Sequence, residues 1–278
     1  MQVRRIVVAV DASPTSIAAL EATTELAAAW DAEVLGVFVE DVNLIKAASL
    51  PFAREVGSHS GSFRPIDPAG VRRQLRSQAG RARETLIRAA TSHRVTVSFR
   101  VARGRVNEEL LSALSQADLL SLGKGGRTIA ARLGLGSTAR AIASSANGHV
   151  LLLSHVSHVT GPIAVVHDGS PVADQALNIA GDLAVRINTQ ATALCVSNTR
   201  ETSGELALRV DATASASGFN VRCRHCTRTD SRELARLARF FGANMMVVPV
   251  RSALLSDQVV EGIVRDFFGP VLLVAERD

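Results

Sequence analysis

The sequence predicts an α/β protein of two tandem domains, each built on a five-stranded, mainly parallel sheet flanked by helices. Its 278 residues suit two domains of about 140 residues each. Short apolar runs alternate with helical segments, and this alternation occurs twice along the chain. Strands that alternate with helices usually pair in parallel, so helices are expected on both faces of each sheet.

One pattern is present in two copies, which indicates duplication of an ancestral unit. The spacing between matching segments shrinks along the chain, so the first copy carries an insertion, which we place at Val42–Pro68. That stretch is rich in Gly, Ser and Pro. The domains are expected at 1–155 and 160–278, with a polar linker at Ser154–Pro162. The matching segments are 6–14 with 163–171, 117–120 with 243–246, and 150–152 with 271–273.

The first copy shows each expected element in turn. Val3–Val10 is a continuous apolar run, which is typical of a buried strand. Ser13 and Pro14 then suit the N-cap and first turn of a helix. A ligand is expected beyond the carboxyl ends of the strands, where the strand order reverses. The further strands are expected at 33–39, 95–102, 118–122 and 148–153, and the helices at 14–30, 69–92, 106–116 and 137–146.

Composition excludes several classes of protein. The net charge is +5, but aromatic residues make up only 4% and there is no Tyr, which argues against nucleic-acid binding. The arginines between Arg72 and Arg88 fit the solvated face of an amphipathic helix. Every apolar run is too short to span a membrane. The N-terminus lacks the apolar region of a signal peptide, so a cytoplasmic location is expected.

The three cysteines are too few for a disulfide framework and fit a reducing compartment. Cys223 and Cys226 form a C-x-x-C string, but it falls in a predicted strand, where residues three apart face opposite sides. We therefore expect Cys195, Cys223 and Cys226 to be incidental, with a redox or metal role as the alternative.

A glycine-rich segment after the fourth strand is the strongest candidate for a binding site. Gly123 and Gly126 are followed, nine residues later, by Gly136 and Ser137. Glycines accept positive φ and let backbone N–H groups converge on a phosphate, and Ser137 opens a helix whose N-terminus attracts anions. Lys124 and Arg127 could neutralise phosphate charge. The alternative is an ordinary surface loop, and the segment is not a Walker A motif.

These residues resemble the ATP-binding branch of the universal stress protein family, which is marked by G-x2-G-x9-G-(S/T). The strand ending in Val8–Ser13 is similar to the family's V-A-V-D-x-S opening, and Val39 matches its H-V segment, although Phe38 replaces the usual His. Lys124 is a further departure, because the family often has other residues there. The resemblance covers nearly the whole chain and implies two Rossmann-like domains of the adenine nucleotide α-hydrolase type.

The resemblance also implies a role for individual residues. Asp11 would lie near the ribose and the metal-bound phosphates, although it could equally be a helix-capping carboxylate. Mg²⁺ or Mn²⁺ would bridge the phosphates of ATP near Asp11. Ala9, Val10 and Val39 would line the adenine pocket, and Gly123, Gly126, Gly136, Ser137 and Thr138 would hold the triphosphate.

The second copy is expected to have an empty site. It keeps Asp168–Pro171, but no glycine pattern follows its fourth strand. Asp257 and Glu261 would place negative charge where phosphates should go. His167 is expected to be a strand-end side chain and not a catalyst.

The fifth strands, Val150–Leu153 and Val271–Val274, are short, apolar and uninterrupted. Relatives with one domain per chain dimerise largely through this strand, so we expect the two copies to pair as an intramolecular pseudo-dimer, with a larger homo-oligomer as the alternative. The function expected is that of an ATP-binding stress-response regulatory protein acting on unknown protein partners. The alternatives are an interaction scaffold that binds no nucleotide, and a slow ATPase.

Overall fold

The computed structural model describes residues 3–11, 13–56, 63–124, 136–154, 158–197, 200–226, 230–252 and 254–276. Within these residues, two α/β halves share one sheet of ten strands. The first half supplies β1 (Arg5–Val10), β2 (Glu33–Asp41), β5 (Val97–Gly104), β6 (Leu119–Gly123) and β7 (His149–Leu153). The second half supplies β8 (Ile163–His167), β9 (Ala191–Val196), β10 (Val221–Cys226), β11 (Met245–Pro249) and β12 (Val271–Val274).

The strand order is β10-β9-β8-β11-β12-β7-β6-β1-β2-β5, so the two halves have the same internal order. All pairs within a half are parallel. The predicted fold, two tandem domains with five-stranded parallel sheets, is therefore confirmed. In the first half the chain runs from β1 to β2 and β5 on one side, and then returns to β6 on the other. The strand order thus reverses between β1 and β6, where ligands bind in open α/β sheets.

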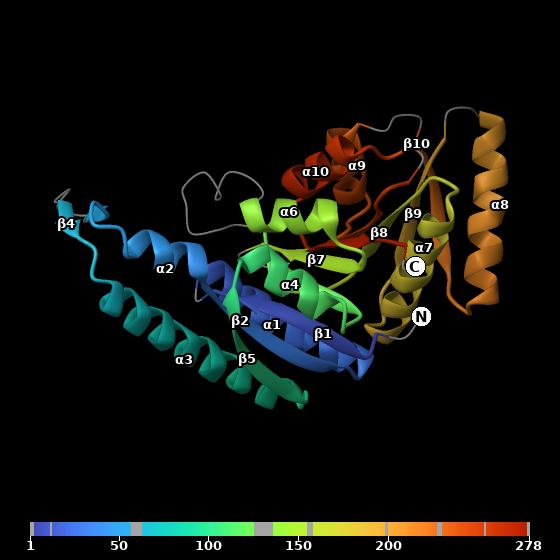
Figure 1. Cartoon of the computed structure of the whole chain (residues 1–278). Helices are drawn as coiled ribbons and strands as arrows, with labels where there is room; N and C mark the ends of the chain where they lie inside the picture. The colour runs from blue at the N-terminus through green and yellow to red at the C-terminus, as the bar shows by residue number, and fades with distance from the viewer. Residues whose placement is uncertain are drawn as a thin grey trace.

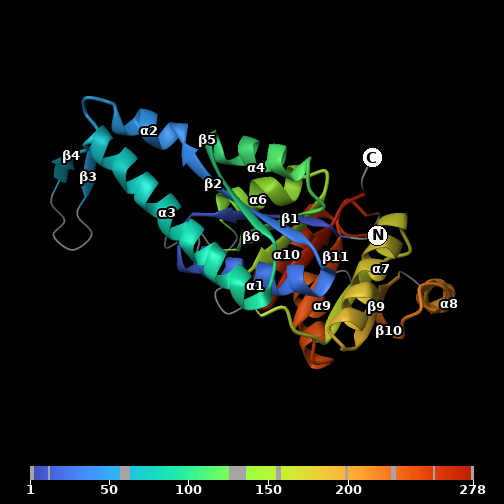
Figure 2. The ribbon, with the colours of Figure 1, turned by 90° about the horizontal axis from the view of Figure 1, so that it is seen from below.

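Helices cover both faces of the sheet and enclose two apolar cores, each of which extends through both halves (Figure 1; Figure 2). No helix in the described part of the chain is long and apolar enough to cross a membrane. One face carries α1 (Pro14–Trp30), α3 (Pro68–His93), α7 (Pro171–Arg186) and α8 (Arg200–Ala216). The other carries α4 (Val106–Leu114), α6 (Ser137–Ser145), α9 (Ser231–Phe240) and α10 (Asp257–Asp266).

Equivalent residues start the first helix of each half. The Oγ of Ser13 accepts a hydrogen bond from the Ser16 N–H at 3.2 Å, and the Oγ of Ser170 accepts one from the Ala173 N–H at 3.3 Å. A proline follows each of these N-caps. Proline suits the first turn, because its fixed φ is helical and its missing N–H would have had no partner there.

The fifth strands join the halves, as the sequence predicts. β12 pairs with β7 in antiparallel register, with Leu272 opposite Leu151, and both strands are fully buried. The helices add a contact on one face of the sheet, where the Trp30 Nε1 donates to an Asp182 carboxylate oxygen at 3.0 Å. The edges that could have paired with another chain are therefore used within this one.

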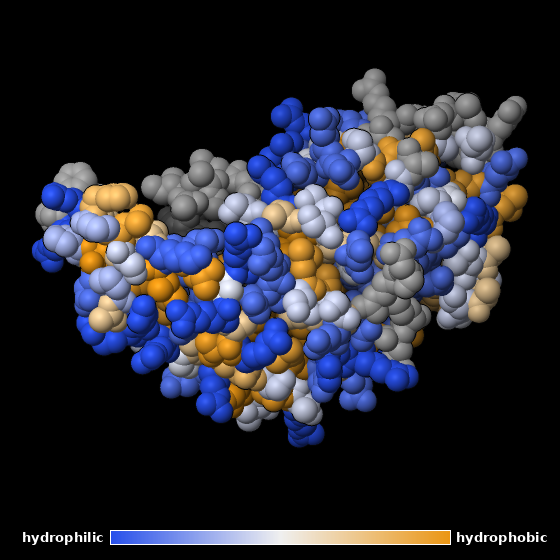
Figure 3. Space-filling view, viewed as in Figure 1, coloured by the Kyte–Doolittle hydropathy of each residue, from blue (hydrophilic) through white to orange (hydrophobic). Residues whose placement is uncertain are grey.

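The insertion predicted at Val42–Pro68 contains secondary structure that the sequence analysis does not anticipate. It includes α2 (Val42–Ala48) and a hairpin of β3 (Arg54–Val56) and β4 (Phe63–Pro65). These elements and the start of α3 extend away from the sheet (Figure 1). Hydrophobic residues gather over this part of the surface (Figure 3). Its exposed large apolar side chains are Leu44, Leu50 and Phe52.

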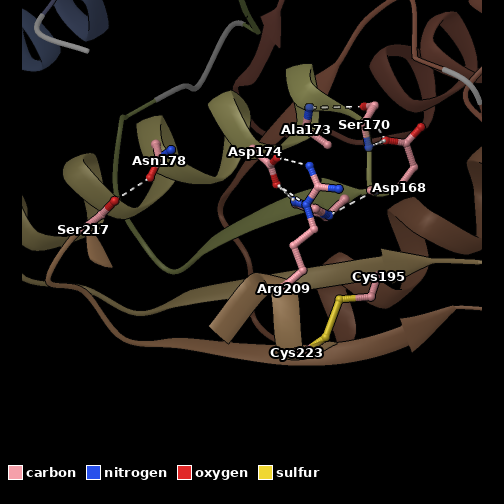
Figure 4. Close-up of polar contacts among 11 residues, drawn as sticks. Asp168, Ser170, Ala173, Asp174, Asn178, Cys195, Arg209, Ser217 and Cys223 are labelled. Carbon is pink, nitrogen blue, oxygen red and sulfur yellow. Dashed lines mark hydrogen bonds and ion pairs between the residues drawn. A yellow bond between two sulfur atoms is a disulfide. The ribbon is translucent and has the colours of Figure 1, made fainter. Parts of the chain in front are cut away.

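The expectation that all three cysteines are incidental is wrong. Cys195 of β9 and Cys223 of β10 form a disulfide, with their Cα atoms 6.4 Å apart (Figure 4). The C-x-x-C spacing points only to Cys223 and Cys226, whereas the disulfide connects two neighbouring strands that are far apart in sequence. Cys226 is free and buried, and burial raises the pKa of its thiol to about 11.

Candidate functional site

A cavity of about 510 Å³ lies at the carboxyl ends of β1, β2 and β6, at the reversal point of the first half. Its volume falls within the usual range for small-molecule sites. Apolar side chains from β1, β2, α4 and β6 form one part of the lining, and polar groups from the β1–α1 turn, α1, the end of β2 and α6 form another. The lining residues used below are Ala9, Val10, Asp11, Val39, Asp41, Val106, Leu110, Leu122, Gly123, Gly136, Ser137 and Thr138.

Asp11 lies in a tight turn between β1 and α1. Its Oδ1 accepts from the Ser13 N–H at 3.0 Å, and its own N–H donates to the Ser16 Oγ at 3.1 Å. The helix cap itself is Ser13, so Asp11 supports the turn and does not cap the helix. Asp11 is exposed and lines the cavity, which leaves its carboxylate accessible to a ligand.

The N-terminus of α6 opens into this cavity. Its N-cap is Gly136, which has no side chain that could cap the helix. Gly136, Ser137 and Thr138 line the cavity, so the N–H groups of the first turn, which have no partner within the helix, lie beside a space large enough for a ligand. This arrangement, together with the positive end of the helix dipole, favours an anion.

Gly136 does not adopt the positive φ expected of the loop glycines. Its φ is −61° and its ψ is 154°, which any residue can adopt. Backbone freedom therefore does not explain the glycine at this position.

The structure brings most of the predicted binding residues together. Ala9, Val10, Asp11, Val39, Gly123, Gly136, Ser137 and Thr138 all line the cavity. Gly126 and Arg127 lie outside the described residues. Lys124 is among the described residues, but it does not line the cavity, and its side chain contacts the second half.

Sequence reasoning did not identify Asp41, or Val106 and Leu110 of α4, as cavity residues. The position of Asp41 at the carboxyl end of β2 was a usable signal, because the carboxyl ends of parallel strands meet at one edge of the sheet. The approach of α4 to this edge depends on helix packing, which the sequence does not show.

Lys124 lies between the two halves. Its side chain is buried, and its Nζ donates to the carbonyl oxygens of Phe267 at 2.8 Å and Gly269 at 2.7 Å. Burial lowers its pKa from 10.5 to about 7, because a charged amine is less stable away from water. The expected role of Lys124, direct neutralisation of phosphate charge, does not match this placement.

The corresponding region of the second half is arranged differently (Figure 4). The Leu254 N–H donates to the Asp168 Oδ2 at 3.2 Å, so the chain after β11 folds onto this carboxylate. Burial alone would raise the pKa of Asp168, but hydrogen bonds from Ser170 hold it below its ordinary value. At the start of α10, the Ser256 Oγ accepts from the Val259 N–H at 3.4 Å.

A side chain therefore caps α10, and Asp257 adds negative charge to its first turn. A cavity of about 500 Å³ remains in the second half, but it extends toward α8, where Glu205 lines it together with Asp168. Glu261, which the sequence analysis places near the phosphate position, instead lies 3.9 Å from Arg140 of α6.

His167 has the structural role that the sequence analysis predicts. It is fully buried at the end of β8, where its Nε2 is 3.0 Å from the Asp174 Oδ1 and its Nδ1 accepts from the Gly169 N–H at 3.3 Å. Burial lowers the pKa of the imidazole, although the Asp174 carboxylate opposes this shift. The Asp174 carboxylate in turn pairs with Arg209 (Figure 4). These contacts fix the ring.

The fold and the cavity define a class of protein: a tandem, doubly wound α/β protein with a candidate anion site in its first half. The family model of the universal stress protein family matches residues 2–154, which is more than half of the chain. The protein therefore belongs to the universal stress protein family. No curated protein matches the sequence.

Solved structures show the same fold over the whole chain. A universal stress protein from Archaeoglobus fulgidus DSM 4304 is 14% identical, with a TM-score of 0.78 and coverage of 99% of both chains. A functionally unknown protein from Pseudomonas aeruginosa PAO1 is 13% identical, with a TM-score of 0.60, and the match covers 98% of this chain and 92% of that one. At these identities the likeness concerns the fold alone.

Proposed function

We propose that the first half binds ATP together with a divalent cation, and that the protein acts as a nucleotide-dependent regulator. The observation that carries this proposal is the N-terminus of α6, where the N-cap glycine supplies no side-chain cap and which faces a cavity at the reversal point of the sheet. Helix N-termini at such positions are suited to phosphate groups.

The lining of the cavity matches the chemistry of the two ends of ATP. Val39, Val106 and Leu122 offer an apolar surface for a purine ring. The phosphates would take the position beside Gly136, Ser137 and Thr138, where free N–H groups can donate to them. Asp11, in the turn between β1 and α1, also lines the cavity and offers a carboxylate for ribose hydroxyls or for the cation.

The cation would depend largely on the nucleotide. Asp11 and Asp41 are the carboxylates in the lining, and the described residues contain no group of three or more His, Cys, Asp or Glu that could hold a metal. Mg²⁺ commonly binds through one or two carboxylates, phosphate oxygens and water, so this sparse set fits Mg²⁺ or Mn²⁺ bound with ATP. The cation would neutralise phosphate charge.

A regulatory role fits this lining better than catalysis. Among the described lining residues there is no His, Lys or Cys, and the carboxylates that could act as a base, Asp11 and Asp41, would bind the ribose or the cation. The scaffold alternative gives no reason for the uncapped helix beside a cavity of this size. We therefore favour a protein whose nucleotide-bound and nucleotide-free forms differ in how they bind partner proteins.

Mass spectrometry of gently purified protein, followed by titration with ATP and Mg²⁺, tests this proposal. We expect ATP either to copurify or to bind when added, and binding to weaken when Mg²⁺ is removed. A chain that neither retains ATP nor binds added ATP with Mg²⁺ or Mn²⁺ would contradict the proposal and favour the scaffold alternative.

A further inference from the structure

The side chain of Lys124 connects the first half with one turn of the second half. Its Nζ donates to the carbonyl oxygens of Phe267 and Gly269, which lie in the short segment between α10 and β12. We call Phe267–Gly269 the seam turn. Only 9% of the Lys124 residue is exposed, so water competes little for these hydrogen bonds.

The backbone of the same residue connects to the proposed nucleotide site. The Lys124 N–H donates to the Leu153 carbonyl at 2.6 Å, which holds the end of β6 against β7. The Lys124 carbonyl accepts from the Gly136 N–H at 2.8 Å. Because Gly136 is the N-cap of α6, Lys124 links the seam turn to the helix N-terminus that faces the cavity.

A second residue of the first half contacts the seam turn. The Ser154 Oγ donates to the Phe268 carbonyl at 2.5 Å. Three consecutive carbonyls of the turn, at Phe267, Phe268 and Gly269, therefore accept hydrogen bonds from the first half. The position of this turn depends on the position of the strand ends that border the first-half site.

A second basic side chain, that of Arg251, connects the two halves in the opposite direction, from the second half to the first. Arg251, which follows β11, donates to the Asn147 Oδ1 at 3.0 Å and to the Ser144 carbonyl at 3.3 Å. In each half, a basic side chain thus donates hydrogen bonds to the segment before the fifth strand of the other half. Arg251 is exposed, whereas Lys124 is buried. The Lys124 carbonyl also accepts a hydrogen bond from Gly136, the N-cap of α6.

We propose that Lys124 is a positioning residue through which nucleotide in the first half and the seam turn of the second half stabilise each other. This inference rests on the proposed function, because it requires a nucleotide in the first-half cavity. Phosphate bound beside Gly136 restrains the N-terminus of α6, and Lys124 carries that restraint to the seam turn. Coupling between two sites is reciprocal, so the second half also sets the nucleotide affinity of the first.

Hydrogen exchange on the intact chain tests the coupling. We expect amides of 267–272 to exchange more slowly when ATP and Mg²⁺ are added to the wild-type protein. Lys124→Met removes the donors but keeps a long side chain, and we expect it to weaken ATP binding about tenfold and to abolish the slower exchange. Lys124→Arg keeps donors and is expected to retain part of both effects.

Lys46→Met is the matched control, because Lys46 is the only other lysine and lies exposed on α2. It should leave ATP affinity and the slower exchange unchanged. If Lys124→Met loses stability but keeps both, Lys124 is merely structural and the inference is wrong. If the methionine variant does not fold, hydrogen exchange of the wild type with and without ATP decides. ATP binding without slower exchange at 267–272 would overturn the coupling. Absence of ATP binding to the wild type would instead overturn the proposed function.

Discussion

At the scale of single residues, the two halves differ at the N-cap of the helix before the fifth strand. Gly136 leaves the first N–H groups of α6 without a side-chain acceptor, whereas Ser256 supplies its hydroxyl to the first turn of α10. Under the proposed function, a phosphate would bind at this position in the first half, whereas the Ser256 hydroxyl already occupies it in the second. Asp257 strengthens the difference, because a carboxylate in the first turn repels a phosphate.

Gly136→Val is expected to abolish ATP binding and leave the fold intact. The backbone at this position is open to any residue, so the effect would come from a side chain that occupies the phosphate position. Calorimetric titration with ATP and Mg²⁺ measures it, and circular dichroism checks the fold. Ser256→Ala changes the equivalent N-cap and should cost about 1 kcal/mol of stability without altering ATP affinity. Undiminished binding to the valine variant would refute the proposed phosphate position.

Lys124 predicts a stability change above neutral pH. Its pKa is about 7 when folded and 10.5 when exposed, so between these values the unfolded chain binds more protons. The free energy of unfolding should therefore rise with pH, by about 2 kcal/mol between pH 7.5 and 9 from this group. A neutral amine still has two N–H groups for the two carbonyls. Urea unfolding of wild type and Lys124→Met measures the difference, and parallel pH dependences would contradict the assignment.

The outcome for Lys124 shows the limit of sequence reasoning at this scale. A lysine between glycines after a parallel strand suggests a phosphate ligand, because strand ends and loops border the site. Its actual partners, Phe267 and Gly269, lie far away in sequence and are brought near by the pairing of β7 with β12. Backbone carbonyls leave no signature in side-chain chemistry, so this contact could not be predicted.

At the scale of elements, the local patterns were sufficient for most helices and strands. Ser13 and Ser170 mark the starts of α1 and α7, and the apolar run before each marks a buried strand. The sequence predicts the position of the insertion but not its secondary structure. The reason is that α2 and the β3–β4 hairpin are too short for a clear periodicity. The partnership of Cys195 with Cys223 also escaped prediction, because it follows from the adjacency of β9 and β10.

The disulfide between these strands should contribute to stability. It connects residues separated by 28 positions, and closing a loop of this size is worth about 3.6 kcal/mol. Reductant should therefore lower the free energy of unfolding by this amount in the wild type. Cys226→Ala should respond to reductant as the wild type does, whereas Cys223→Ala should not respond. Identical unfolding curves with and without reductant in the wild type would exclude a stabilising disulfide.

At the scale of the whole molecule, duplication explains both the single sheet and the asymmetry of the halves. The internal repeat and the short, apolar, uninterrupted fifth strands were enough to predict that β7 and β12 meet. The loss of the glycine pattern predicted a changed second site, but not its form. In the structure the chain folds onto Asp168 through Leu254, and a cavity bordered by Asp168 and Glu205 remains.

The number of ATP molecules bound by each chain tests the central claim most directly. The uncapped α6 beside a cavity predicts a site in the first half, and the capped α10 with its nearby carboxylates predicts none in the second. Calorimetric titration of the intact chain with ATP and Mg²⁺ should therefore give a stoichiometry of one. Two equivalent sites would contradict the account of the second half, and no binding at all would contradict the account of the first.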